Sequence, residues 1–137
     1  MRWLLAAAAA PLLFAPTVLG AEQAKVQKCS AILVNYSGRT LQLKKASSLP
    51  AWSPGFHPQP APSIEDNSAV YWWTDGGSRG CWNHVVYRSG GRVVELTVDG
   101  RAGHRRSARC RQSGFQRCRI LVRTIRPPRL YLSVRLS

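Results

Sequence analysis

Residues 52–87 read WSPGFHPQPAPSIEDNSAVYWWTDGGSRGCWNHVVY and contain four of the five tryptophans in the chain. The first half of this stretch is too rich in proline for a helix, because proline lacks an amide donor and clashes with the preceding turn. The second half has two segments rich in aromatic and β-branched residues, 69–74 and 81–88, on either side of the glycine turn at 75–80. This pattern predicts two β-strands joined in a hairpin, and with them an all-β fold.

The segments outside this stretch repeat the pattern of short apolar runs separated by turn residues, and none shows helical periodicity over about ten residues. Residues 30–36 and 39–45 predict a second hairpin that turns at Ser37-Gly38. About eight short strands predict a single antiparallel β-sandwich, with a compact barrel as the alternative. The expected strands are 30–36, 39–45, 69–74, 81–88, 92–98, 117–125 and 129–136, with 46–63 as a surface crossing held by Trp52 and Phe56, and 99–116 as a cationic loop.

The first twenty residues have the composition of a secretory signal peptide. Arg2 precedes an apolar, alanine-rich run, and Val18-Leu19-Gly20 stands before a cleavage point near Gly20. We therefore expect a secreted or periplasmic protein in which residues 21–137 form one domain. In an exported chain, Asn35-Tyr36-Ser37 also matches an N-glycosylation sequon, provided that the source glycosylates such proteins.

All four cysteines lie after this leader, and an even count in an exported chain predicts two disulfides with three possible pairings. We favour Cys110–Cys118 as a local clamp and Cys29–Cys81 as a long-range tie. Zinc sites usually contain cysteine pairs spaced C-x2-C, and this spacing is absent from the sequence. We therefore expect no metal site, and no motif indicates a cofactor.

The chain has a formal net charge of +14, and this charge is unevenly distributed. Between residues 21 and 80, six basic residues are balanced by four acidic ones; between 81 and 137, thirteen arginines are balanced only by Glu95 and Asp99. Such an excess favours a polyanionic partner: nucleic acid, lipopolysaccharide, anionic lipid or an acidic protein. The alternative is codon usage in a GC-rich genome, which explains arginine in place of lysine but not the scarcity of acidic residues.

The last two expected strands place arginines on one face. In 129–136, four aliphatic residues alternate with polar ones and are expected inside: Leu130, Leu132, Val134 and Leu136. In 117–125, Cys118, Ile120 and Val122 are expected to share the inner face, and a tight reversal at 126–128 would bring Arg119 opposite Arg135. Arginine binds phosphate and carboxylate in a bidentate manner. The expected anion- or lipid-binding residues are Arg117, Arg119, Arg123, Arg129, Arg135 and Tyr131, together with Arg105, Arg106, Trp72 and Trp73; the alternative is a solvated cationic face.

Trp72 and Trp73 are consecutive on an expected strand and should therefore point to opposite faces. One of them is expected in the core. The other either lies under the proline-rich crossing or faces outward, where an indole can insert at a lipid interface, stack on a sugar or stack on a nucleotide base.

A secreted basic ribonuclease would need a general acid and a general base beside a cation that stabilises phosphate charge. His84 and Glu95 lie on neighbouring expected strands and are the candidates for such a site, whereas His57 and His104 lie in expected loops. Nothing in the sequence fixes this arrangement, and the serine hydrolase motif G-x-S-x-G is absent. We therefore expect no enzymatic activity and assign no catalytic residue.

Residues 31–98 resemble the aegerolysin and actinoporin-like family, which includes bacterial crystal-type cytolysins. The resemblance rests on turns and aromatic residues: VNYSGRTLQL at 34–43, Trp52, PAPSI at 60–64, WWT at 72–74, Gly76-Gly77 and VVY at 85–87. It implies a lipid- or membrane-binding β-sandwich, sometimes lytic together with a partner. The arginine-rich second half and the four cysteines depart from the usual pattern of aegerolysins.

Charge, export and this resemblance together predict a basic binding protein that acts on an anionic membrane or envelope surface, cytolysin-like and without enzymatic chemistry. The alternative is a periplasmic or secreted inhibitor or immunity-type protein that blocks an acidic effector. A nucleic-acid binder or ribonuclease is the third hypothesis, which an exported location disfavours.

Overall fold

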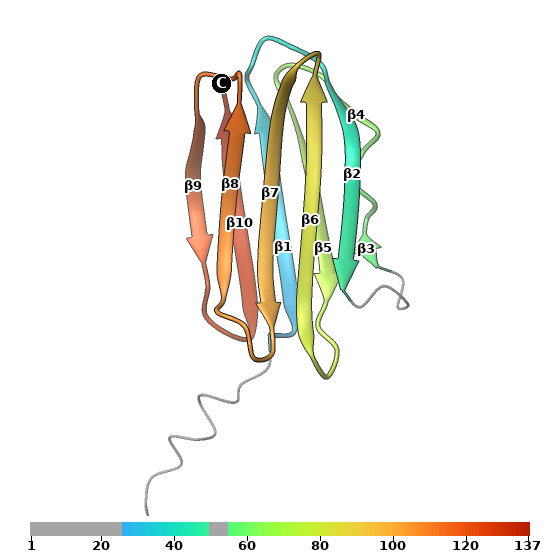
Figure 1. Ribbon diagram of the computed structural model, residues 1–137, viewed down its shortest axis with the longest axis vertical. Helices are drawn as coiled ribbons and strands as arrows, with labels where there is room; N and C mark the ends of the chain where they lie inside the picture. Colours follow the sequence, from blue (N-terminus) through green and yellow to red (C-terminus); the bar gives the residue numbers. More distant parts are fainter. Residues whose placement is uncertain (1–25, 50–54) are drawn as a thin grey trace, which may run out of the picture.

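Two five-stranded β-sheets face each other and enclose the core (Figure 1). The structure is a computed structural model that describes residues 26–49 and 55–137, so the expected signal peptide at 1–20 and Trp52 lie outside the described residues. The strands are β1 (Lys28–Asn35), β2 (Leu41–Leu49), β3 (Phe56–His57), β4 (Ser63–Ile64), β5 (Ser68–Asp75), β6 (Gly80–Ser89), β7 (Arg92–Arg101), β8 (Ser107–Ser113), β9 (Cys118–Thr124) and β10 (Arg129–Leu136). Sheet A has the order β3-β5-β1-β10-β9, and sheet B has the order β4-β2-β6-β7-β8.

The all-β sandwich is confirmed, and the described residues form ten strands where about eight were expected. One neighbouring pair, β1 with β10, is parallel, so the sandwich is not wholly antiparallel as expected. Parallel neighbours need a long connection, and here almost the whole described chain separates the first strand from the last. Within residues 26–49 and 55–137, no helix is long and apolar enough to span a membrane.

The inner faces of the two sheets form one hydrophobic core. The four aliphatic residues of β10 that were expected inside are fully buried, as are the two largest core side chains, Trp72 and Tyr87. Both favoured disulfides are present in the structure. Cys29–Cys81 joins β1 of sheet A to β6 of sheet B, and Cys110–Cys118 joins the edge strands β8 and β9.

Neither hairpin expected in the first half of the chain forms. β1 and β2 belong to opposite sheets, and so do β5 and β6, so each turn carries the chain across the sandwich. Gly80 suits the second crossover because it has a positive φ of 79°, and a Cβ there would clash with the carbonyl oxygen of Gly100. The turns themselves were predicted correctly. However, strands of both sheets show the same alternation of apolar and polar residues, so this alternation does not indicate whether a turn joins two strands of one sheet or crosses to the other sheet.

Asn35 holds the first crossover. Its buried side-chain amide donates to the carbonyl oxygens of Arg39 (2.7 Å) and Ile64 (3.1 Å), and its side-chain oxygen accepts a hydrogen bond from the Ser37 hydroxyl (2.6 Å). A glycan attached to this nitrogen would replace these contacts. The sequon at Asn35 therefore coincides with a structural asparagine, and the fold gives its amide no room for a sugar.

The expected loop at 99–116 is wrong in large part, because β7 continues to Arg101 and β8 spans Ser107–Ser113. In β8 the less exposed positions include Ala108, Cys110 and Gln112, and the two exposed positions between them are arginines. Because the inward residues are small or polar, the sequence lacks the apolar alternation that predicts a strand. The proline-rich crossing also contains the two short edge strands β3 and β4.

Phe56 is buried and anchors the crossing as expected. A second anchor comes from Tyr87, whose hydroxyl donates to the carbonyl oxygen of Ala61 (2.7 Å). Burial raises the pKa of the Tyr87 phenol, which therefore stays protonated and keeps donating this hydrogen bond at neutral pH. The crossing is thus fastened to sheet B from within the core.

Candidate functional site

One long side of the sandwich is formed by β8 of sheet B and β9 of sheet A (Figure 1). The Cys110–Cys118 disulfide ties these two strands together, and no acidic residue follows Asp99 in the sequence. We call residues 104–126 the arginine edge. Its eight arginines are Arg105, Arg106, Arg109, Arg111, Arg117, Arg119, Arg123 and Arg126.

Strand β9 exposes aliphatic side chains to solvent. Ile120, Leu121 and Val122 are 43%, 45% and 48% exposed, and Ile125 just beyond the strand is 40% exposed. β9 is the last strand of sheet A and is hydrogen-bonded within the described residues to β10 alone. An exposed apolar run on an edge strand, set among arginines, is a feature that marks interaction sites.

A β-bulge at Leu121 changes which side chains of β9 share a face. Val122 pairs with Ser133, whereas Ile120 pairs with Val134 on the other side of the bulge, leaving Leu121 as the extra residue. Arg119 lies directly opposite Arg135, as expected.

The prediction that Arg119 and Arg123 lie on the same face of the strand is wrong. Arg123 pairs with the inward-facing Leu132, so it lies on the same side as Ile120, while Val122 faces outward with Arg119. Direct partners in an antiparallel pair share a face, and one extra residue reverses every assignment beyond it.

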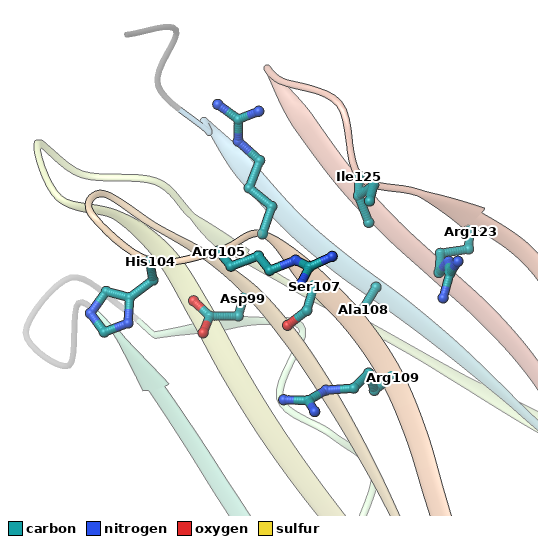
Figure 2. Close-up of a pocket in the computed structure, with 9 residues that line it drawn as sticks. Asp99, His104, Arg105, Ser107, Ala108, Arg109, Arg123 and Ile125 are labelled. Atoms are coloured by element: carbon teal, nitrogen blue, oxygen red, sulfur yellow. The ribbon is translucent and has the colours of Figure 1, made fainter. Parts of the chain in front are cut away.

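The bulge thereby divides the arginines between two hollows at opposite ends of β9. A hollow of about 300 Å³ near the start of β9 is lined by Arg117, Arg119 and Arg135, with Gln116 and Ser137. A second hollow, of about 510 Å³, lies near the end of β9. Arg123 and Ile125 line it from the β9 side, and His104, Arg105 and Arg109 line it from the β7–β8 loop and β8 (Figure 2). Arg106, Ser107, Ala108 and Asp99 complete the second lining, which we call the Arg123 hollow.

Among the described residues that line the Arg123 hollow, Asp99 is the one acid, and its carboxylate is hydrogen-bonded to Arg101. Its carboxylate accepts hydrogen bonds from Arg101 Nη2 (2.8 Å), Nε (3.0 Å) and the backbone N–H (3.1 Å). Burial alone would raise the pKa of Asp99, but these hydrogen bonds and the charges of Arg101 and His104 outweigh burial and hold this pKa below its ordinary value. Asp99 is therefore ionised at neutral pH, with its charge already compensated.

Replacing Asp99 with asparagine should lower the free energy of unfolding at neutral pH by about 1 kcal/mol, because Arg101 loses a charged partner that solvent only partly screens. A carboxylate with a depressed pKa contributes stability above its unfolded pKa of about 3.9, and this contribution is lost as pH falls through the folded pKa. The gap between wild type and Asp99→Asn should therefore close below about pH 4. Urea unfolding of both proteins at neutral and acidic pH measures this gap; a gap that persists unchanged in acid contradicts the assignment.

The two tryptophans point to opposite faces, as expected. Trp72 is fully buried, so its expected part in lipid binding is wrong. Trp73 lies on the outer face of sheet A, where its ring stacks on His57 (centroids 4.6 Å apart) and Lys28 Nζ sits 4.2 Å from the ring centroid. β5 and β9 are separated by β1 and β10, so Trp73 lies apart from the arginine edge.

The remaining expected site residues lie on β10. Tyr131 pairs with Thr124 of β9 and with Ser30 of β1, and is partly buried on the outer face of sheet A. Arg129 pairs with Lys28 at the end of the β1–β10 ladder, away from Arg119 and Arg135. The structure thus brings together two subsets of the predicted residues rather than a single face.

His84 and Glu95, the candidates for acid–base chemistry, do meet. Their side chains lie 3.1 Å apart on the outer face of sheet B, from the paired strands β6 and β7. His57 stacks on Trp73 and His104 lines the Arg123 hollow, so the three histidines occupy three separate places.

Sequence reasoning missed Arg109, Arg111 and the exposed aliphatic residues of β9. The alternation of Arg109 and Arg111 with Ala108 and Cys110 was a signal for β8, and the unbroken run Ile120–Leu121–Val122 was a signal against simple alternation in β9. A run of three apolar residues on an otherwise alternating edge strand is compatible with a bulge.

Comparison with known proteins shows a likeness in fold. No family model matches the chain, and no curated protein matches its sequence. Among solved structures, the chain is similar to the crystal structure of the lipid binding protein Nakanori, with a TM-score of 0.54 and 13% sequence identity over 87% of this chain and 75% of that one. At this identity the likeness shows the fold alone, and it supports the expected family resemblance only at the level of the β-sandwich fold.

Proposed function

We propose that this protein is an exported, non-enzymatic binding protein that attaches to anionic membrane or envelope surfaces through the arginine edge. The observation that carries the proposal is the exposure of Ile120, Leu121 and Val122 on an edge strand that also holds Arg119 and Arg123. Aliphatic side chains enter the boundary between headgroups and acyl chains, while the arginines bind the phosphates of anionic headgroups.

Both contributions favour attachment to a charged lipid surface. Each basic residue near such a surface adds about 1 kcal/mol, and each buried CH₂ group adds about 0.8 kcal/mol. The lack of acidic residues after Asp99 means that little in the second half of the chain opposes this attraction. The fold likeness to a lipid binding protein supports the proposal, and two disulfides suit an oxidising compartment outside the cytoplasm.

The chemistry of β9 also disfavours self-association through this strand. Antiparallel pairing of two copies of β9 centred on Leu121 would place Arg119 of one copy opposite Arg123 of the other, and like charges directly opposed are destabilising. The bulge further interrupts the ladder that a second copy would need. The edge is therefore better suited to an anionic partner than to another copy of itself.

A second function is favoured by one observation: within the described residues, β9 has a hydrogen-bonded neighbour on one side only. An acidic protein could add a strand to that free edge, as an inhibitor or immunity-type protein would require of its effector. The exposed aliphatic residues, which strand addition does not need, place this function second.

Salt dependence on vesicles tests the proposal. The wild-type protein should co-sediment with phosphatidylcholine vesicles that contain phosphatidylserine, and should bind pure phosphatidylcholine vesicles much more weakly. Raising the salt from about 0.1 M to about 1 M shortens the Debye length from about 10 Å to about 3 Å and should release most of the protein. Equal binding to neutral and anionic vesicles, or binding to an oligonucleotide but to neither kind of vesicle, would contradict it.

A further inference from the structure

The Arg123 hollow gathers positive charge from three segments of the chain. Arg105 and Arg106 come from the β7–β8 loop, Arg109 from β8 and Arg123 from β9, and they line a volume of about 510 Å³. Figure 2 shows Arg105, Arg109 and Arg123 on these three segments. Volumes of about 300–1,000 Å³ are typical of sites for small molecules. The Cys110–Cys118 disulfide links β8, which carries Arg109, to the start of β9, whose other end carries Arg123.

Within the part of the chain that the structure describes, these four arginines have no acidic partner. The ion pairs among residues 26–49 and 55–137 join His57 to Asp75, His84 to Glu95 and Arg101 to Asp99. The carboxylate of Asp99, which also lines the hollow, already accepts side-chain and backbone hydrogen bonds from Arg101. The hollow is therefore left with the four guanidinium groups, which bind phosphate oxygens in bidentate fashion.

We propose that the Arg123 hollow binds one ligand through two phosphate groups. A phosphomonoester carries about −1.5 to −2 charges at pH 7, so two of them balance the four arginines, whereas a single phosphate leaves half of the charge uncompensated. The arginines come from three segments of the chain and are therefore spread around the hollow, which suits two phosphates on one ligand better than one phosphate at a single point.

The surroundings of the hollow indicate an amphiphilic source for these phosphates. Ile125 forms part of the lining and is 40% exposed, and the exposed aliphatic residues of β9 continue from it along the same edge. A doubly phosphorylated lipid headgroup would place its phosphates in the hollow and its acyl chains beside β9. This inference rests on the proposed function, but a soluble diphosphate carries the same two groups and is the second source that the experiment must separate.

The test compares two double variants that remove the same charge from the two ends of β9. Arg109→Ala with Arg123→Ala opens the Arg123 hollow, and Arg117→Ala with Arg119→Ala alters the opposite hollow as the matched control. Binding is measured to phosphatidylcholine vesicles containing either a bisphosphorylated inositol lipid or, at equal total charge, phosphatidylserine. Inorganic pyrophosphate and inorganic phosphate are titrated in solution by calorimetry, and thermal unfolding verifies that each variant is folded.

Wild type should bind the bisphosphorylated vesicles roughly tenfold more tightly than the phosphatidylserine vesicles, as expected for additional charge-assisted hydrogen bonds. The first double variant should lose this preference, and the control should keep it while binding both vesicles more weakly. Binding of pyrophosphate over phosphate, without a vesicle preference, would assign the two-phosphate site to a soluble ligand. Salt-sensitive binding to all anionic vesicles with neither preference overturns this inference and leaves the proposed function standing.

Discussion

Trp72→Ala is expected to lower the free energy of unfolding by about 3–5 kcal/mol, the usual cost of truncating a large buried aromatic side chain. Trp72 is fully buried, and its indole N–H donates to the Asn83 side-chain oxygen (3.1 Å). The Asn83 amide in turn donates to the carbonyl oxygen of Cys29 (3.1 Å) and to the Thr74 hydroxyl (3.2 Å). The substitution therefore creates a cavity and removes one partner from a buried polar network that links the two sheets.

Trp73→Ala is the matched control, since it deletes the same side chain one residue along the same strand. Trp73 lies on the outer face, where it is partly buried beside His57 and Lys28, so its loss should cost about 1 kcal/mol. Urea unfolding followed by circular dichroism measures both variants. Should Trp72→Ala fail to fold, Trp72→Phe provides a milder step of the same sign. A larger loss for Trp73 than for Trp72 would show that the faces of β5 are assigned the wrong way round.

The parts of the fold that the sequence predicted are those with local causes. The strict alternation of β10 placed its four aliphatic residues inside, and the glycine pair at 90–91 correctly predicted the β6–β7 hairpin. The disulfide pairing was also correct, because Cys110 and Cys118 are near in sequence and this left Cys29 to pair with Cys81.

The errors concern relations that sequence pattern does not encode. Two turns were read as hairpins although they cross between sheets, because strands of both sheets alternate in the same way. β8 was read as a loop because its inward positions are small or polar. In the site, the bulge at Leu121 places Val122 and Arg123 on the faces opposite to those expected. A bulge depends on the hydrogen-bond register with the partner strand, so the sequence of β9 alone does not predict it.

Replacing both Leu121 and Val122 with serine should weaken binding to anionic vesicles by roughly 10- to 30-fold. Each side chain is nearly half exposed, so insertion into lipid would bury the remaining surface and contribute about 1 kcal/mol per residue. The variant keeps every arginine, and therefore isolates the apolar contribution from the electrostatic one. Because both side chains face solvent, the free energy of unfolding should change by less than about 0.5 kcal/mol per residue.

Tyr71→Ser is the matched control. Tyr71 is an exposed hydrophobic residue on the outer face of sheet A, and it lies on β5, with β1 and β10 between it and β9. The substitution removes a comparable exposed hydrophobic side chain and leaves the arginine edge unchanged.

The deciding measurement is co-sedimentation of wild type, the Leu121/Val122 double serine variant and Tyr71→Ser with phosphatidylcholine–phosphatidylserine vesicles at low salt. Attachment through β9 predicts that the double variant alone loses binding, while Tyr71→Ser stays within about twofold of wild type. If the double variant binds as tightly as wild type, or if Tyr71→Ser loses as much, β9 is not the surface that meets the membrane.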